Sequence, residues 1–234
     1  MKNDATRQLT FELPSRPALG REDFFQAPSN ALALAMLDGD WQGQTRMVLT
    51  GPAGSGKTHL AHVWAQETGA QVLPALDLAA TLRAVLDNPL LPLVVEDIDD
   101  LAGDRDREEP LFHLLNARAQ SGAGPLLLTH QGAVADGGFA LPDLQSRLLS
   151  LPLAALEAPD DQLLAVVLVK LFADRQIEVP GEVITYLCRH MERSFADAGA
   201  IVAQLDKAAL AAKRPITRPL AASVLHALYG HNDL

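Results

Sequence analysis

Hydrophobic and polar positions divide this chain into two blocks with different periodicity. In the first block, short runs that are apolar at nearly every position alternate with stretches of helical spacing. The runs lie at 47–49, 70–73, 91–95, 126–128 and 151–156. Such runs are typical of strands buried on both faces, and their alternation with helices predicts a parallel sheet. From about residue 158 onward the spacing is helical only, which predicts a second, all-helical domain.

Helix boundaries are indicated by capping and helix-breaking residues. In the first block we expect helices at 31–37, 59–68, 77–86, 107–120 and 141–148. In the second block we expect them at 160–174, 181–193, 195–213 and 217–229. Ser29 or Asn30, Asp160 and Thr217 stand where N-cap residues are expected, and Pro142 stands near the first position of its helix. The chain is therefore predicted to divide into an extended tail (1–20), an α/β domain (21–157) and a helical domain (158–234).

A glycine-rich loop and a helix follow directly after the first apolar run. The loop reads Gly51-Pro52-Ala53-Gly54-Ser55-Gly56-Lys57-Thr58 and fits the phosphate-binding pattern GxxxxGK[ST] without exception. In this context the backbone N–H groups form an anion-binding nest, and the helix N-terminus adds its positive dipole end. Lys57 is then expected to reach the β- and γ-phosphates, and the Thr58 hydroxyl to bind Mg²⁺. A glycine-rich turn that binds nothing is the alternative; the sequence predicts a site for ATP or ADP.

Acidic residues come directly after the third apolar run. Glu96 and Asp97 stand where a Walker B motif places one carboxylate that helps to hold Mg²⁺ and a neighbour that orients or deprotonates the attacking water. A loop of solvated acids is the alternative, and the P-loop upstream favours the metal site. Thr129 follows the fourth run. It is placed to sense a γ-phosphate or the attacking water, or else it is a satisfied strand-end threonine.

Two stretches near the N-terminus carry further candidate chemistry. In the tail, Leu9, Phe11 and Leu13 alternate with polar positions after Gln8. This alternation suits an extended peptide that docks in a groove or along a sheet edge, and it equally suits a segment that covers the protein's own surface. The pair Phe24-Phe25 precedes the P-loop block, where aromatic rings either line a pocket for a nucleotide base or pack in the core.

Composition excludes several classes of function. The net charge of −10 over 234 residues argues against a broad nucleic-acid-binding face, which would need many basic side chains to neutralise phosphates. A single cysteine, Cys188, rules out an internal disulfide framework. The chain opens with polar residues and its apolar runs are too short to span a bilayer, so we expect a cytoplasmic protein without a membrane partner.

The combined features resemble the AAA+ ATPases of the DnaA clade, and among them the DnaA-homologous regulators of bacterial replication initiation. The resemblance is carried by the stretches 24–30, 51–60, 96–97, 141–148 and 204–208. The stretch 141–148, Leu-Pro-Asp-Leu-Gln-Ser-Arg-Leu, is the most discriminating of them. The resemblance implies an AAA+ parallel sheet flanked by helices and followed by a small all-α lid. It also implies a nucleotide site that includes His59, with Phe25 and Asn30 in the region of the base pocket.

The same resemblance implies roles and partners. Arg147 matches the family's arginine finger, which stabilises charge on the γ-phosphate of a neighbouring subunit, and Thr129 matches its sensor 1. The tail around Gln8 is similar to the peptide with which replication proteins dock on the DNA polymerase sliding clamp (β subunit). The implied partner is DnaA, whose ATP would be hydrolysed so that initiation is restrained. A homodimer is also compatible with the family.

Two departures from the family pattern bear on activity. Ala196 stands where the family carries its sensor 2 arginine, and Walker B reads Glu-Asp where DnaA proteins usually show Asp-Asp. DnaA's carboxy-terminal DNA-binding domain has no counterpart in the sequence, so we expect no sequence-specific DNA binding. These departures favour an adaptor with at most weak ATPase activity of its own. The alternative is an AAA+ motor or helicase-loader-type protein that acts through its own ATP turnover.

Overall fold

The computed structural model describes residues 25–39, 41, 44–120 and 122–230. Its first part is a five-stranded parallel sheet in the order β2-β3-β4-β1-β5. The strands are β1 (Arg46–Gly51), β2 (Gln71–Pro74), β3 (Leu93–Glu96), β4 (Leu126–Gln131) and β5 (Leu153–Ala155). The sheet therefore places β1, which ends in the P-loop, beside β4, and β4 beside β3, which ends in the acidic pair.

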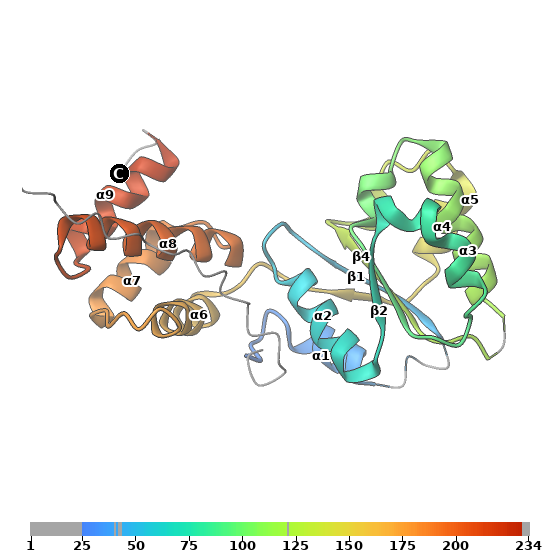
Figure 1. Cartoon of the computed structure of the whole chain (residues 1–234), viewed down its shortest axis with the longest axis horizontal. Helices are drawn as coiled ribbons and strands as arrows, with labels where there is room; N and C mark the ends of the chain where they lie inside the picture. Colours follow the sequence, from blue (N-terminus) through green and yellow to red (C-terminus); the bar gives the residue numbers. More distant parts are fainter. Residues whose placement is uncertain (1–24, 40, 42–43, 121, 231–234) are drawn as a thin grey trace, which may run out of the picture.

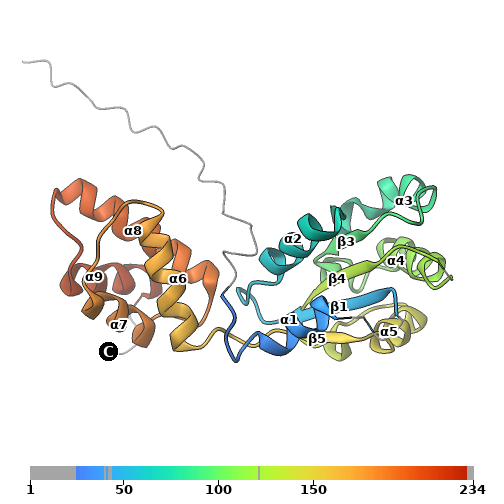
Figure 2. The same ribbon diagram turned by 90° about the horizontal axis from the view of Figure 1, so that it is seen from below.

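Helices cover both faces of this sheet (Figures 1 and 2). One face carries α1 (Ala31–Asp38) and α2 (Lys57–Thr68). The other face carries α3 (Leu78–Leu86), α4 (Arg105–Arg118) and α5 (Pro142–Leu149). The inner strands β1, β3 and β4 are buried at nearly every position, which agrees with their apolar sequence pattern, whereas the edge strands β2 and β5 keep exposed residues.

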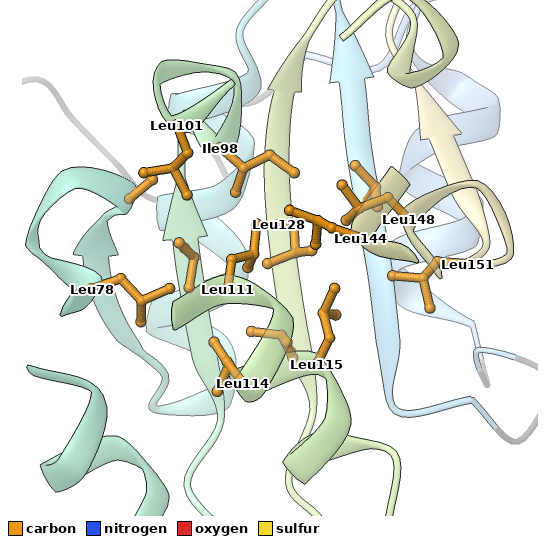
Figure 3. Close-up of a cluster of buried hydrophobic side chains, with 14 of the residues drawn as sticks. Leu78, Ile98, Leu101, Leu111, Leu114, Leu115, Leu128, Leu144, Leu148 and Leu151 are labelled. Carbon is orange, nitrogen blue, oxygen red and sulfur yellow. The ribbon is translucent and has the colours of Figure 1, made fainter. Parts of the chain in front are cut away.

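Two hydrophobic clusters lie back to back across the sheet. Successive strand residues point to opposite faces, so Met47 and Leu49 join the cluster of α1 and α2 while Val48 joins the other one. Figure 3 shows this second cluster, in which Leu111, Leu114 and Leu115 of α4 lie around Leu128 of β4, with Leu144 and Leu148 of α5 beside them. The second cluster therefore anchors α4 and α5 on the sheet.

The helical part begins after β5. It contains α6 (Asp161–Ala173), α7 (Gly181–His190), α8 (Phe195–Ala212) and α9 (Arg218–Tyr229). These helices bury a hydrophobic cluster of their own that includes Leu164, Phe172, Leu187 and Leu205 and shares no residue with the clusters of the sheet. The described chain contains no helix both long and apolar enough to cross a membrane.

The fold class predicted from the sequence is confirmed, with shifts at several boundaries. The predicted helix 77–86 begins one residue later, because the short 3₁₀ turn η2 (Ala75–Asp77) precedes it. β4 is longer than its apolar run, since parallel pairing with β1 continues to the pair Gly51 and Gln131. Thr129 therefore lies inside a strand and not after one.

Asn30, Asp160 and Thr217 occupy the N-cap positions predicted for them, but only Asp160 makes a capping hydrogen bond with its side chain. Asp160 caps α6, where its side chain accepts a hydrogen bond from the Leu163 N–H at 2.8 Å. Asn30 and Thr217 occupy the N-cap positions of α1 and α9, but neither side chain makes a capping bond. Ser29 is no cap either, because its hydroxyl is buried without a partner among the described residues.

Candidate nucleotide-binding site

The predicted P-loop connects the end of β1 to the start of α2. Gly51 is the last residue of the strand and Lys57 is the first of the helix. Gly56 stands at the N-cap with φ 93°, a left-handed conformation that favours glycine. The first N–H groups of any helix have no intrahelical partner, and those of Lys57 and Thr58 open the N-terminus of α2, where anions bind. The local geometry is that of an anion-binding loop.

Lys57 is buried within this loop. Its ammonium group donates hydrogen bonds to the carbonyl oxygens of Gly51 and Pro52, both at 2.9 Å. Burial lowers the pKa of Lys57, and the nearby carboxylates of Asp99 and Asp97 oppose that shift. The positive charge is thus held over the loop that the sequence predicts to bind phosphates, with the acidic residues after β3 close to it.

Glu96 lies between two side chains of α2. Its Oε2 atom is 3.2 Å from Nε2 of His62, and the Thr58 hydroxyl lies near enough to the carboxylate to favour its ionised form. Oε1 is buried and has no partner among the described residues. His62 was not singled out from the sequence, although its position four residues after Thr58 places both on one face of the helix. The strand-end acid and the P-loop threonine are therefore brought together.

The residues at this corner fit a magnesium ion. Mg²⁺ prefers oxygen ligands and is often held by one or two carboxylates together with substrate phosphates. The Thr58 hydroxyl and the unpartnered Oε1 atom of Glu96 provide oxygens of this kind. No cluster of three or more potential metal-ligating side chains occurs in the described ranges.

Asp97 adopts a strained backbone conformation beside Thr129. Its φ is 56°, in the left-handed region that residues with a Cβ rarely occupy. Its N–H donates to Oγ1 of Thr129 at 2.8 Å, and the threonine hydroxyl also bonds the Asp97 carboxylate. Burial, followed by the charges of Asp99 and Asp100, raises the pKa of Asp97. Backbone strain of this kind is concentrated at functional sites. The hydrogen bond between Asp97 and Thr129 joins the candidate water-orienting acid to the candidate sensor.

The raised pKa of Glu96 leads to a prediction about stability. Burial raises this pKa, and His62 offsets only part of the shift. The folded protein then binds the proton more tightly than the unfolded chain does, so the stability that this group contributes is fully present below the unfolded pKa and is lost as pH rises through the folded pKa. At pH 7 the ionised carboxylate should cost stability, and Glu96→Gln should raise the melting temperature by about 2 °C.

Thermal unfolding of protein freed of nucleotide and Mg²⁺, recorded at pH 7 and near pH 4, measures this effect. The gain from Glu96→Gln should disappear at the lower pH, where the wild-type carboxyl is protonated. The exposed Glu109 is a matched control, because Glu109→Gln should change the melting temperature little at either pH. A loss of stability on Glu96→Gln at pH 7 would contradict the prediction.

The predicted base-pocket residues have different environments. Asn30 is buried, and its side chain accepts a hydrogen bond from the Ala27 N–H at 2.8 Å and donates one to the Phe25 carbonyl at 2.9 Å. The amide of Asn30 thus shapes the turn that leads into α1. The Phe25 ring is 43% exposed and stands at the start of this turn. Phe24 and the tail residues Gln8, Leu9, Phe11 and Leu13 lie outside the described residues.

Arg147 is not part of this site. It is exposed on α5, with its guanidinium 5.2 Å from the centre of the Phe112 ring. Burial, and after it the charge of Arg147, lowers the pKa of Arg46, which begins β1. The P-loop begins at the other end of the same six-residue strand, about 17 Å away. Arg147 therefore lies at the opposite end of the sheet from the P-loop of its own chain.

The start of α5 is fixed by a carboxylate that the sequence analysis missed. Glu108 of α4 is fully buried and accepts hydrogen bonds from the N–H groups of Gly103 (2.9 Å), Ala140 (2.7 Å) and Leu141 (2.7 Å). A carboxylate bonded to three backbone donors holds the loop before α5 against α4. Glu108 lies three and seven residues before Leu111 and Leu115, on the same face of the helix. This spacing is the sequence signal that could have indicated its burial.

The helical part contacts the P-loop at the start of α8. The Phe195 N–H donates to the Gly54 carbonyl at 2.8 Å. Ala196 is exposed in the first turn of the helix, and it offers no charge. Arg193, the nearest basic side chain in the sequence before it, is bonded at 2.7 Å to Asp161 of α6. Within the described residues, the lid contacts the P-loop through the Phe195 N–H and the side chains of Ser194 and Phe195, none of which is charged.

Comparison with known proteins matches this architecture. Residues 160–225 match the family model described as "Hda, lid domain". The replication initiator DnaA of Thermomicrobium roseum is 25% identical over 255 residues, which covers 96% of this chain and 54% of that protein. The chain thus spans about half the length of this curated relative.

Solved structures of DnaA share the fold. Domain III of DnaA from Thermotoga maritima superposes with a TM-score of 0.76 and 18% identity, and the match covers 94% of this chain and all of that one. DnaA from Aquifex aeolicus, bound to AMPPCP, gives a TM-score of 0.66 with 18% identity over 82% of this chain and 66% of that one.

The parallel sheet, its covering helices and the helical lid share the fold of DnaA domain III. The chain is similar to DnaA over nearly its whole length, and its helical lid matches the Hda lid domain.

Proposed function

We propose that this protein is a nucleotide-bound regulatory adaptor that stimulates ATP hydrolysis by DnaA while docked on the sliding clamp. The observation that carries the proposal is the position of Arg147. An exposed guanidinium on a well-anchored helix, at the sheet edge opposite the P-loop of its own chain, suits action on the nucleotide of a neighbouring molecule. The relation to DnaA and to Hda makes DnaA the expected neighbour and replication initiation the expected process.

The nucleotide in this proposal is ADP or ATP held by the P-loop. Lys57 would shift from the Gly51 and Pro52 carbonyls to the phosphates, and the N–H groups at the start of α2 would bond phosphate oxygens. Thr58 and Glu96 would hold Mg²⁺, which supplies charge neutralisation to the phosphates when bound. The AMPPCP bound to DnaA of similar fold supports a nucleotide here.

Turnover of this bound nucleotide by the protein alone should be weak. Asp97 and Thr129, which are hydrogen-bonded to each other, would orient a water molecule, but the first turn of α8 presents Ala196 where the family carries an arginine. The charge of Arg193 is engaged with Asp161. In our proposal the nucleotide therefore holds the protein in the shape that acts on DnaA, and the hydrolysed ATP belongs to DnaA.

Docking on the clamp is assigned to residues 8–13. Deleting residues 1–13 should weaken binding to the isolated clamp at least about tenfold, because an extended docking peptide contributes most of the contacts in such a complex. Surface plasmon resonance on immobilised clamp measures this affinity. Nucleotide affinity should be unchanged by the deletion.

Substitutions distinguish the effect of losing specific side chains of the docking peptide from the effect of shortening the chain. Gln8→Ala combined with Leu9→Ala should reproduce the deletion, whereas replacing Lys2 and Asn3 by alanine should not. Equal clamp affinity for the deletion and the full chain would remove the clamp from the proposed function, and the action of Arg147 would then need another means of meeting DnaA.

A further inference from the structure

The turn between α7 and α8 sits directly on the P-loop. Besides the bond from Phe195 to the Gly54 carbonyl, the Phe195 ring lies where a side chain on Gly56 would stand, with Cε2 only 3.1 Å from that Cβ position. Ser194 occupies the corresponding space above Gly54, whose φ is 67°. Glycine at 54 is thus needed both for the loop conformation and for the approach of the lid.

A cluster of three hydrogen-bonded residues connects this turn to the end of α9. Tyr229, the last residue of α9, donates its hydroxyl proton to Oδ2 of Asp197 in the first turn of α8. The Glu192 N–H, in the α7–α8 turn, donates to the same carboxylate oxygen at 3.2 Å and to the Tyr229 hydroxyl at 3.1 Å. The Asp197 N–H in turn donates to the Ser194 hydroxyl at 3.3 Å. The cluster therefore connects the end of α9 to the residue that lies over Gly54.

The protonation of Tyr229 suits a permanent donor. Burial, and after it the hydrogen bond to Asp197, raises the pKa of Tyr229 to about 12. The hydroxyl consequently keeps its proton throughout the physiological pH range. A hydrogen bond to a carboxylate is about twice as strong as one between neutral groups, so its loss should loosen the Ser194–Phe195 turn.

We propose that Tyr229 is a positioning residue for the nucleotide site, which holds the Ser194–Phe195 turn on the P-loop through Asp197 and the Glu192 N–H. This inference rests on the proposed nucleotide binding. Ala196 offers no charged contact to the nucleotide. In its place, the lid turn that α9 holds packs on the P-loop and keeps the loop in its binding conformation. Because such coupling is reciprocal, nucleotide binding should also stabilise the end of α9.

The test uses Tyr229→Phe in the full chain, which removes the hydroxyl and keeps the ring. Isothermal titration with ADP and with ATP should show affinity about tenfold weaker than wild type, the effect expected for one lost hydrogen bond to a charged group. Tyr186→Phe is the matched control, because Tyr186 lies in the same helical part with its ring stacked on His190. The control should bind both nucleotides as wild type does.

Hydrogen exchange distinguishes positioning from a purely structural role. In wild type, ADP should slow exchange of the amides at 192–198 and at the end of α9, and Tyr229→Phe should remove that protection while the core amides of α6 and α7 stay protected. Asp197→Asn should have the same effect. The double variant should be no weaker than the stronger single one, because both changes break one cluster.

Unchanged nucleotide affinity in Tyr229→Phe, alongside faster exchange at 192–198, would overturn the inference and leave Tyr229 a structural residue of the lid. Uniform loss of protection across the helical part would also overturn it, since the variant would then act by unfolding the lid. Failure of the wild-type protein to bind ADP or ATP would instead refute the proposed function, and the two failures are therefore distinguishable.

Discussion

Replacing Arg147 by alanine is expected to reduce stimulation of DnaA ATP hydrolysis by about a thousandfold, the lower end of what arginine fingers contribute. The guanidinium is the group that would reach the neighbour's γ-phosphate, and α5 holds it at a defined place. Its central carbon lies over the Phe112 ring, 5.2 Å from the ring centre, and the three bonds of Glu108 fix the entry to α5. The measurement is phosphate release by ATP-bound DnaA on clamp-loaded DNA with the variant added.

Arg83→Ala is the matched control for this experiment. Arg83 is exposed on α3 and pairs with Asp87 of the same helix end, so its removal should leave stimulation unchanged. Arg147→Ala should also bind ADP, ATP and the clamp as wild type does, because Arg147 lies at the far end of β1 from the P-loop. Full stimulation by Arg147→Ala would refute the proposed mechanism.

Replacing Lys57 by alanine is expected to weaken binding of ATP and ADP by at least about 100-fold. The ammonium is buried and aimed into the loop, so a bound phosphate would lose a charge-assisted hydrogen bond that water cannot replace. Titration with a fluorescent ATP analogue measures the change. The expected loss exceeds that for Tyr229→Phe, because Lys57 would contact the ligand and Tyr229 acts through the lid turn.

Lys207→Ala serves as the control for Lys57→Ala. Lys207 is exposed on α8, well beyond the turn that meets the P-loop. Its removal takes away the same formal charge and should leave affinity unchanged. If Lys57→Ala bound nucleotide as tightly as this control, the loop would be a structural turn and the nucleotide part of the proposed function would be wrong.

The residues that contact one another over short stretches of chain could be predicted from the sequence. The turn Gly51–Thr58 is local: its glycines, its lysine and the helix that follows are adjacent in the chain, so the pattern alone indicates the geometry. The parallel sheet is also visible in the sequence, because strands covered on both faces must be apolar at nearly every position.

The surroundings of the candidate site could not be predicted in this way. Asn30 matched a cap position, yet its amide bonds Ala27 and Phe25, because the buried turn before α1 offered it better partners than the helix end. The sequence does not distinguish Asp97 from the other acids after β3. Its strained conformation is held by the hydrogen bond to Thr129 of the neighbouring strand β4. These outcomes depend on which other groups compete for the same hydrogen bonds.

The sequence by itself determined the class of fold, the phosphate-binding loop and the acidic corner, because each is written in adjacent or periodic residues. Only the tertiary structure decided what surrounds them. Glu108 meets Ala140 and Leu141 across more than thirty residues, and Tyr229 meets Asp197 across thirty-two. Contacts of this range follow from how α4, α5, α8 and α9 pack against one another, and no local pattern in the chain records that packing.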